Sequence, residues 1–383
     1  MKRRSFIQLS GATLGFMGLP LSVQAADAND MRLFVVLCRG GLDGLAACQP
    51  TDSEIKNLRD RTFVKSGKSI TGSFQLHPAL SFMGKQWDEG HLTVVHAAGF
   101  GYDGRSHFDG QNLMESGGTV PYDIGTGWAG RALEELSGRS SIALSLPTPL
   151  VLRSLAPTDN LYPSSLPEAG ASKSLVATLW QDDPKLALFG EKIGKSGVGN
   201  GDGMFQTRRP TGTNPSVLAR EAARQMSNPD GPRVGFVEFT GFDTHSNQGA
   251  ENGEQARYLS RVDDIFMSYA SFSAELWSKT VIVTVSEFGR TAKENGTAGT
   301  DHGYASCIFI SGGAVRKSEV VTDWPGLSSR KLYQGRDLDQ TVDARDVYGQ
   351  VLKYVFNLNA SQLTEKVFPG SKQQLVIEGL QKA

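Results

Sequence analysis

Short apolar runs rich in β-branched residues recur along the chain, and each of them ends abruptly in polar residues. The clearest runs are Met31–Leu37, Leu92–His96, Arg233–Phe239, Val281–Val285 and Ala305–Ile310. Continuous apolar runs of this length are typical of strands that are buried on both faces of a sheet. Such strands need helices on both sides. The pattern therefore predicts an α/β fold with a central, mostly parallel sheet sandwiched between helices.

Periodic apolar positions predict helices between several of these strands. Spacing typical of amphipathic helices occurs over Trp128–Leu136, Ser216–Met226 and Glu251–Trp277. Asp343 stands where it would cap a last helix over Ala344–Phe356. Strand, loop and helix alternate along much of the chain, and the sequence contains no internal repeat.

The first 25 residues have a different character. Residues 2–7, Lys-Arg-Arg-Ser-Phe-Ile, carry the Arg-Arg-x-Phe core of a twin-arginine export signal, and Val23-Gln24-Ala25 is a small-residue cleavage pattern. The apolar stretch between them is short of the ~20 residues that a membrane-spanning helix needs. We therefore expect residues 1–25 to be a signal peptide, with the twin-arginine translocase as a partner during export. The mature protein is then periplasmic or secreted, without a stable membrane anchor. A short anchor helix that is retained is the alternative.

We expect residues 26–383 to form a single domain, because no charge block or long proline-rich linker divides them. Residues 192–214 are rich in Gly, Lys, Arg, Thr and Asn and offer little to bury, so they predict a mobile loop that could act as a lid. Arg208 and Arg209 in this loop could contact an anionic substrate.

Charge and cysteine content exclude several functions. The formal net charge is −1, and residues 1–25 hold three basic residues and no acidic one, which leaves −4 for the rest. A mildly acidic chain has no global signature of nucleic-acid binding. The three cysteines, Cys38, Cys48 and Cys307, form no Cys-x-x-Cys motif, so we expect buried free thiols rather than a thiolate metal site.

Acidic residues and histidines gather at the ends of the predicted strands. They are Asp43 after the first strand, Asp243, His245 and Glu287 after two later strands, and Asp301 and His302 before the strand at Ala305–Ile310. Sites in open α/β sheets form at the carboxyl ends of strands. Carboxylate oxygens and imidazole nitrogens suit zinc, and also manganese or iron. These residues predict a site for one or two divalent ions, zinc or manganese. Two ions could clamp the attacking and leaving oxygens of a phosphoryl or sulfuryl transfer. A hydrogen-bonded structural pair at each strand end is the alternative.

Ser106 and His107 stand at the predicted start of a helix, after a glycine-rich loop. Ser106 is a good N-cap, and Asp109 follows three residues later. The oriented N–H groups of a helix start also stabilise anions. Ser106 is therefore either a cap or a nucleophile, and His107 is a candidate ligand or base. His96, at a strand end, is either a satisfied core histidine or part of the site.

Several short motifs occur in an order that resembles one protein family. They are Arg39-Gly-Gly-Leu-Asp43-Gly, Leu76-His-Pro-Ala-Leu80, Ser106-His-Phe-Asp109, Gly127-Trp-Ala-Gly-Arg131, Phe242-Asp-Thr-His245, Ser286-Glu-Phe-Gly-Arg-Thr291, Thr300-Asp-His-Gly303 and Asp323-Trp-Pro-Gly326. Over essentially the whole mature chain, this pattern resembles the exported bacterial family known as domain of unknown function 1501. That family is similar to the alkaline phosphatase and sulfatase superfamily.

The resemblance implies an alkaline-phosphatase-like fold and roles for individual residues. Ser106 resembles the nucleophile of that superfamily. The residues that resemble the metal ligands of the superfamily are Asp43, Asp243, His245, Asp301 and His302. Glu287 stands near a position where the superfamily usually has an aspartate. No Cys-x-Pro-x-Arg motif is present, which argues against a formylglycine-dependent sulfatase.

The resemblance and the site residues together predict an exported, metal-dependent hydrolase of phosphate or sulfate esters. An anionic ester would place its non-bridging oxygens against the metal and Arg290, and either Ser106 or a water molecule on the metal would attack. The alternative is a non-catalytic periplasmic binding or assembly protein on a degenerate hydrolase fold. The identity of the substrate and the oligomeric state stay open.

Overall fold

The computed structural model describes residues 30–136, 138–145, 147–161, 214–273 and 275–381. The predicted signal peptide lies outside the described residues. So does the predicted mobile loop, except for its last residue, Asn214, which caps a helix.

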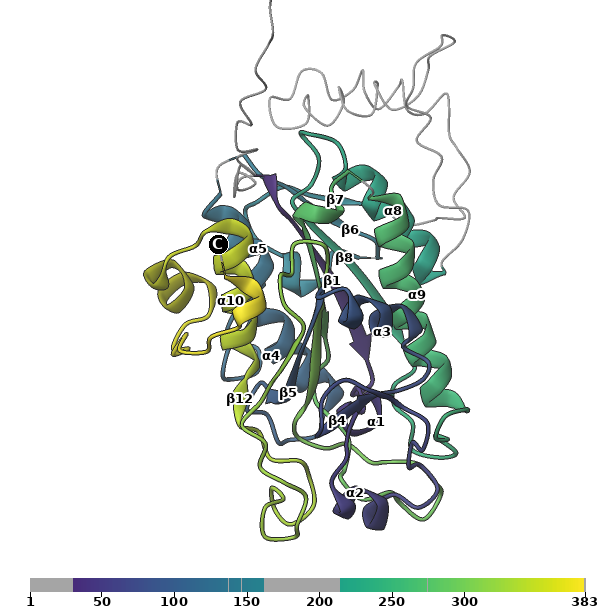
Figure 1. The fold of residues 1–383 in the computed structure, drawn as a ribbon. Coiled ribbons are helices and arrows are strands. Elements are labelled where there is room, and N and C mark those ends of the chain that lie inside the picture. The colour runs from purple at the N-terminus through teal and green to yellow at the C-terminus, as the bar shows by residue number, and fades with distance from the viewer. Residues whose placement is uncertain (1–29, 137, 146, 162–213, 274, 382–383) are drawn as a thin grey trace, which may run out of the picture.

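Nine strands form one mixed sheet at the centre of the described part of the molecule (Figure 1). They are β1 (Arg32–Arg39), β5 (Leu92–Gly99), β6 (Ser141–Ala143), β7 (Thr158–Asn160), β8 (Val234–Thr240), β9 (Thr280–Val285), β10 (Ser306–Ser311), β11 (Glu319–Val321) and β12 (Val342–Asp343). Their order is β11-β5-β10-β9-β1-β8-β6-β7, and β12 also pairs with β5. Among these strands, only β10 runs antiparallel to its neighbours, β5 and β9.

Helices cover both faces of this sheet (Figure 1). One face packs against α4 (His107–Ser116), α5 (Trp128–Glu134) and α10 (Ala344–Phe356), and the other packs against α3 (Ser81–Asp88), α8 (Pro215–Met226) and α9 (Glu254–Phe272). The predicted α/β fold with a mostly parallel sheet between helices is confirmed. The helix expected from Glu251 begins at Glu254, because Gly253 has a φ of 122°, which is outside the helical region.

Strand β1 shows why the sheet needs both layers. Its alternate residues Leu33, Val35 and Leu37 belong to the core under α4, α5 and α10, and Phe34 and Val36 belong to the core under α3, α8 and α9. All five side chains are fully buried. Burial of one such side chain contributes about 1.5–3 kcal/mol, so the central strand is held from both sides.

The carboxyl ends of β1, β8 and β9 lie at one edge of the sheet. The three strands are parallel and in register, since Arg39 pairs with Thr240 and Leu37 pairs with Val285. Because β10 is antiparallel to β9, the loop before β10 reaches the same edge. Gly40 lets these loops approach closely, because a Cβ atom on it would lie 2.5 Å from the backbone nitrogen of Asp243.

Beside this edge, a small sheet of β2 (Cys48–Pro50), β4 (Phe74–Leu76) and β3 (Lys68–Ser69) accompanies the short helices α1 (Gly44–Ala47) and α2 (Ser53–Leu58). His96 is a satisfied core histidine here. Its Nε2 lies 2.9 Å from the backbone oxygen of Cys48, its Nδ1 accepts from the N–H of Ala97, and burial lowers its pKa to about 4.

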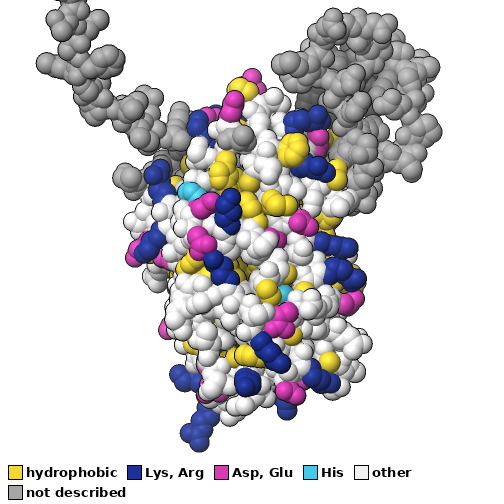
Figure 2. Space-filling model, turned by 45° about the vertical axis from the view of Figure 1, so that its right-hand side comes forward, with side chains coloured by type: hydrophobic (Ala, Val, Ile, Leu, Met, Phe, Trp, Pro, Cys, Tyr) yellow, Lys and Arg dark blue, Asp and Glu magenta, His cyan; other side chains and the backbone are white. Residues whose placement is uncertain are grey.

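The distribution of charge on the described surface agrees with the small net charge of the chain. Figure 2 shows acidic and basic side chains interspersed over one face, without a continuous patch of either sign. None of the described helices combines the length and apolarity that crossing a membrane requires. Cys38, Cys48 and Cys307 are buried free thiols, as predicted.

Candidate metal centre

Three side chains from three different loops bring potential metal-ligand atoms together. His107 is the first residue of α4, Asp243 follows β8, and His302 precedes β10. One ligand atom from each residue lies within 4.8 Å of the other two. Ligands that share an ion at about 2.0–2.2 Å lie up to ~4 Å apart. This spacing is therefore close to what a single ion needs.

His245 adjoins these residues at the open side. Its Nε2 lies 2.9 Å from Asp243 Oδ1 and 3.0 Å from His302 Nε2, and its side chain is 45% exposed. His302 Nε2 lies 2.9 Å from the same carboxylate oxygen. We refer to His107, Asp243, His245 and His302 as the His/Asp group.

The second ring nitrogen of each histidine faces a group that only accepts hydrogen bonds. The Nδ1 atoms of His107, His245 and His302 lie 2.8, 3.0 and 2.8 Å from Glu287 Oε1, Asp301 Oδ1 and the backbone oxygen of Arg105, respectively. Each Nδ1 must therefore carry the proton, which leaves every Nε2 of the neutral rings with a lone pair. Metal-binding histidines are oriented by partners of this kind.

This arrangement brings lone pairs close together, and lone pairs repel one another. His245 Nε2, His302 Nε2 and Asp243 Oδ1 lie within about 3 Å of one another, and none of these atoms has a proton to donate while the rings are neutral. His107 Nε2 is buried without a hydrogen-bond partner in the described structure, although it lies 3.4 Å from Asp243 Oδ2. A bound cation would relieve both conditions. Three imidazole nitrogens and a carboxylate oxygen are a donor set that suits zinc, so the residues fit a divalent ion.

Arg290 keeps Asp243 ionised. Its Nη1 donates to Asp243 Oδ1 at 2.7 Å. Burial opposes ionisation of this carboxyl group, but the hydrogen bond and the charge of Arg290, aided by His302 and His245, lower the pKa of Asp243 to about 2. Asp243 is therefore available as an anionic ligand at any pH near neutrality.

The guanidinium group of Arg290 is committed to the interior. Its side chain is 0% exposed, Nη1 also donates to the backbone oxygen of Gly40 at 3.1 Å, and Nε donates to Thr300 Oγ1 at 3.2 Å. Its Nη2 donates to the backbone oxygen of Thr300. These contacts describe a positioning residue for Asp243. They do not support the predicted contact of Arg290 with a substrate.

Glu287 and Asp301 lie behind the histidines. Glu287 also accepts from the N–H of Gly40 at 2.8 Å, and although burial opposes its ionisation, its hydrogen bonds lower its pKa. The hydrogen bond to Glu287 in turn raises the pKa of His107. Asp301 is braced by Asn295, whose Nδ2 lies 3.1 Å from Asp301 Oδ1. Both carboxylates orient the rings that face the centre. Neither belongs to the set of atoms that meet there.

Arg105 supports His302 through its backbone. Its φ is 56°, which an L-residue other than glycine adopts at a cost of about 1–3 kcal/mol. This conformation aims its carbonyl oxygen at His302 Nδ1. The rings of Phe288 and His107 pack against His302 at centroid distances of 5.0 and 4.3 Å, so the ring is fixed from several sides.

Asp43 lies in the buried interior, in a different environment. Its Oδ2 accepts from Arg59 Nη1 at 2.7 Å and from Gln248 Nε2 at 2.6 Å, and its Oδ1 caps α1 through the N–H of Ala46. The side chains of Asp43 and Arg59 are both 0% exposed. With a guanidinium as counter-charge, Asp43 has the contacts of a structural ion pair. The predicted ligand role finds no support in them.

Ser106 caps α4, as the sequence allowed. Its hydroxyl oxygen accepts from the N–H of Asp109 at 3.5 Å, a long contact, and its own N–H donates to the hydroxyl of Tyr102 at 3.2 Å. The serine directly precedes His107, a member of the His/Asp group. These contacts, together with a hydrogen bond between the side chains of Ser106 and Tyr102, explain the residue as a cap.

Of the predicted site residues, the structure brings together Asp243, His245, His302 and His107, with Glu287, Asp301 and Arg290 around them. Sequence reasoning missed Arg105, Asn295, Phe288 and Arg59. No local pattern indicates their contacts, because each depends on a partner from another loop or on a backbone conformation.

Comparisons with known proteins agree with part of the predicted resemblance. Residues 204–367 match the family model described as "Protein of unknown function (DUF1501)", which confirms the resemblance over that part of the chain. Comparison with curated proteins gives no match.

The chain is also similar to solved structures. One is the alkaline phosphatase from the Antarctic bacterium TAB5, at 11% identity over 89% of this chain and 99% of that one, with a TM-score of 0.34. Another is the PsFucS1 sulfatase from Pseudoalteromonas sp., at 12% identity over 86% and 68%, with a TM-score of 0.40. A third is the phosphonate monoester hydrolase of Agrobacterium radiobacter, at 9% identity over 85% and 73%, with a TM-score of 0.41. At TM-scores below 0.5, these similarities carry no residue roles to this chain.

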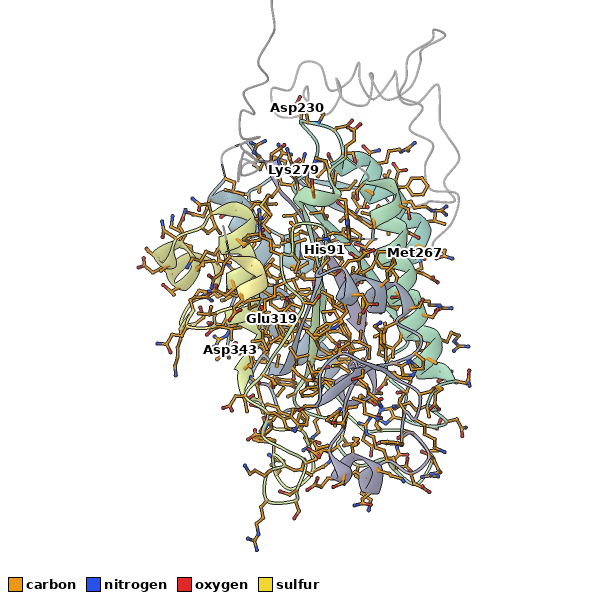
Figure 3. All side chains as sticks on the ribbon, viewed as in Figure 1. His91, Asp230, Met267, Lys279, Glu319 and Asp343 are labelled. Atoms are coloured by element: carbon orange, nitrogen blue, oxygen red, sulfur yellow. The ribbon has the colours of Figure 1, made fainter. Side chains whose placement is uncertain are left out.

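We expect the His302→Ala variant to lose the bound divalent ion, because it removes one of the converging Nε2 atoms. Elemental analysis of dialysed protein by mass spectrometry measures the metal content. His91→Ala is the matched control, because His91 is a histidine outside the His/Asp group. It lies just before β5 and is labelled in Figure 3, and its Nδ1 contacts the backbone oxygen of Val315. Equal metal content in His302→Ala and the unchanged protein would contradict the site.

We expect Asp43→Ala to lower the free energy of unfolding by about 3–5 kcal/mol, because Arg59 would remain buried without its counter-charge. Its metal content should stay unchanged. Denaturant unfolding in the presence of a chelator measures the first quantity, and elemental analysis measures the second. The double variant Asp43→Ala/Arg59→Met should recover much of the loss. Loss of metal at unchanged stability would instead make Asp43 a ligand.

Proposed function

We propose that this protein is an exported, metal-dependent hydrolase of phosphate or sulfate esters that uses one divalent ion. The observation that carries the proposal is the convergence of three Nε2 atoms, which carry lone pairs when the rings are neutral, on the carboxylate of Asp243. Each ring is locked by an acceptor at Nδ1. Hydrogen-bonded structural pairs at strand ends would not need three lone pairs directed at one point.

The donor set favours zinc over the alternative of manganese. Imidazole nitrogens outnumber carboxylate oxygens in the His/Asp group, whereas manganese prefers oxygen-rich sites. One ion rather than two follows from Asp43. Its oxygens already accept from Arg59, Gln248 and Ala46, and the buried guanidinium group of Arg59 balances its charge, which disfavours a second ion there.

A bound divalent ion would supply Lewis-acid polarisation of an ester oxygen and neutralise developing charge. The chain's own residues prepare that setting. Arg290 keeps Asp243 anionic, Glu287 fixes the tautomer of His107, and Asp301 fixes that of His245. Oriented ligands of this kind need little rearrangement when a substrate binds.

Ser106 is the chain's candidate for the attacking group, and a water molecule is the alternative. Its hydroxyl accepts a long hydrogen bond from the N–H of Asp109 and also contacts the hydroxyl of Tyr102, so its proton would have to leave this contact to pass to a base. The start of α4 also favours negative charge that develops on the attacking oxygen and on a bound ester. His107, the next residue, directs its Nε2 towards the same centre.

A non-catalytic binding or assembly protein is the second candidate. Two observations favour it: the Asp43–Arg59 ion pair leaves one cation site instead of two, and Arg290 is fully buried. Such a protein would still bind the ion, but would use it to hold a partner or an anion without turnover.

Hydrolysis separates the two candidates. We expect the zinc-loaded protein to hydrolyse at least one member of a panel of aryl phosphate monoesters, phosphate diesters and aryl sulfates. Activity should fall to background in His302→Ala and persist in His91→Ala. Ser106→Ala should abolish turnover if the serine attacks, and should spare much of it if water attacks. A fully metal-loaded protein that hydrolyses nothing on the panel would favour the binding protein.

We further propose export by the twin-arginine translocase, supported by the Arg-Arg-x-Phe motif of residues 3–6. The substitution of lysine at both Arg3 and Arg4 should leave unprocessed precursor in the cytoplasm. Cell fractionation and immunoblotting report its location, with the single Lys2→Gln variant as control. Normal periplasmic delivery of the double variant would refute this route.

A further inference from the structure

An anionic ester would meet an excess of carboxylates at this centre. Asp243, Glu287 and Asp301 all lie within or directly behind the His/Asp group. The buried Arg290 offsets only the charge of Asp243, and its side chain is not accessible. A bound ion would offset part of the remainder. Recognition of a phosphate or sulfate group therefore requires a further cation that reaches solvent at the same place.

The side chain of Arg105 meets this requirement. It is 37% exposed, and the described partners of its Nη2 are Gln334 Oε1 at 3.1 Å and, at a longer 3.4 Å, Asp337 Oδ2. Arg336 Nη1 lies 3.4 Å from the same oxygen of Asp337. Two guanidinium groups thus share one carboxylate at distances longer than the 2.7–2.9 Å typical of a strong charge-assisted hydrogen bond. One positive charge is left without a close partner.

The backbone of Arg105 places this charge beside the His/Asp group. Its carbonyl oxygen is bonded to His302 Nδ1 at 2.8 Å, so the Cα atom is fixed directly behind one of the converging rings. The following residues are Ser106, which caps α4, and His107. A long, flexible side chain from this position can reach across the entrance of the group, towards the start of the helix.

We propose that Arg105 binds the non-bridging oxygens of the anionic substrate, the role predicted for Arg290 from the sequence. The guanidinium group would exchange its hydrogen bond with Gln334 and its long contact with Asp337 for two parallel hydrogen bonds with a phosphate or sulfate group. Arg105 then serves the site twice: its backbone orients His302, and its side chain recognises the substrate. This proposal rests on the proposed function, because it assumes that an anion binds at the metal.

The left-handed backbone of Arg105 allows these two roles to be separated. Arg105→Gly removes the guanidinium group, while glycine adopts a φ near 56° without strain and keeps the carbonyl oxygen on His302. Arg105→Lys keeps the charge but loses the planar fork. Arg257→Ala is the control, because Arg257 is an exposed arginine near the start of α9 that pairs with Glu254.

Isothermal titration calorimetry of zinc-loaded, full-length mature protein with inorganic phosphate and with sulfate tests the proposal. We expect Arg105→Gly to weaken anion binding at least about tenfold, the usual effect of losing a charge-assisted hydrogen bond. Arg105→Lys should show an intermediate affinity, and Arg257→Ala should bind as the unchanged protein does. Elemental analysis should show the same metal content in all four proteins.

The outcomes distinguish this proposal from the one on which it rests. Unchanged anion affinity in metal-loaded Arg105→Gly would overturn the role of Arg105, whatever the metal does. Absence of anion binding by the unchanged protein would overturn it too. If Arg105→Gly loses its metal, Arg105→Gln decides, since it keeps the backbone and a side chain without charge. Failure of the unchanged protein to bind zinc would refute the proposed function. Anion binding that depends on Arg105 in that metal-free protein would show an anion site that is independent of the metal, and would overturn binding at the metal.

Discussion

The ion pair between Arg290 and Asp243 is the interaction on which the site depends. The buried guanidinium group bonds Asp243 after β8, the carbonyl oxygen of Gly40 after β1, and Thr300 before β10, while Arg290 itself follows β9. One side chain thus connects four loops at the edge of the sheet. Asp243 is 44% exposed, so solvent screens part of this pair, but removal of Asp243 would leave the buried guanidinium group without its counter-charge. The same contact keeps Asp243 anionic, so the stability of this edge and the readiness of the ligand have one cause.

Behind that ion pair runs a continuous chain of buried polar contacts. Arg59 binds Asp43, Asp43 accepts from Gln248, Gln248 accepts from Thr300, and Thr300 accepts from Arg290. Buried polar groups are costly unless each finds a partner, so such a network favours one arrangement of the loops. The carboxylates divide accordingly. Asp43 neutralises an arginine, Glu287 and Asp301 orient histidines, and Asp243 contacts both an arginine and histidines.

The fold could be predicted from the sequence because apolar runs and helical periodicity are local signals. The edge at which the site forms also followed, since the candidate residues stand at strand ends. The division of the acids into ligands and supports could not be predicted. Asp43 resembles a ligand until Arg59 is found beside it, and Glu287 resembles one until its oxygen is found on His107 Nδ1, 180 positions away in sequence. No sequence signal indicates the left-handed backbone of Arg105. This conformation is unfavourable for an arginine, and only its contact with His302 explains it.

The central claim is that one divalent ion binds where the Nε2 atoms of His107, His245 and His302 meet the carboxylate of Asp243. The most direct measurement is an anomalous difference map from crystals of the zinc-loaded protein, with data collected on both sides of the zinc absorption edge. We expect one peak in contact with His107, Asp243 and His302, with His245 beside it, and no peak at Asp43. A peak at Asp43, or no peak within the His/Asp group of fully loaded protein, would contradict it.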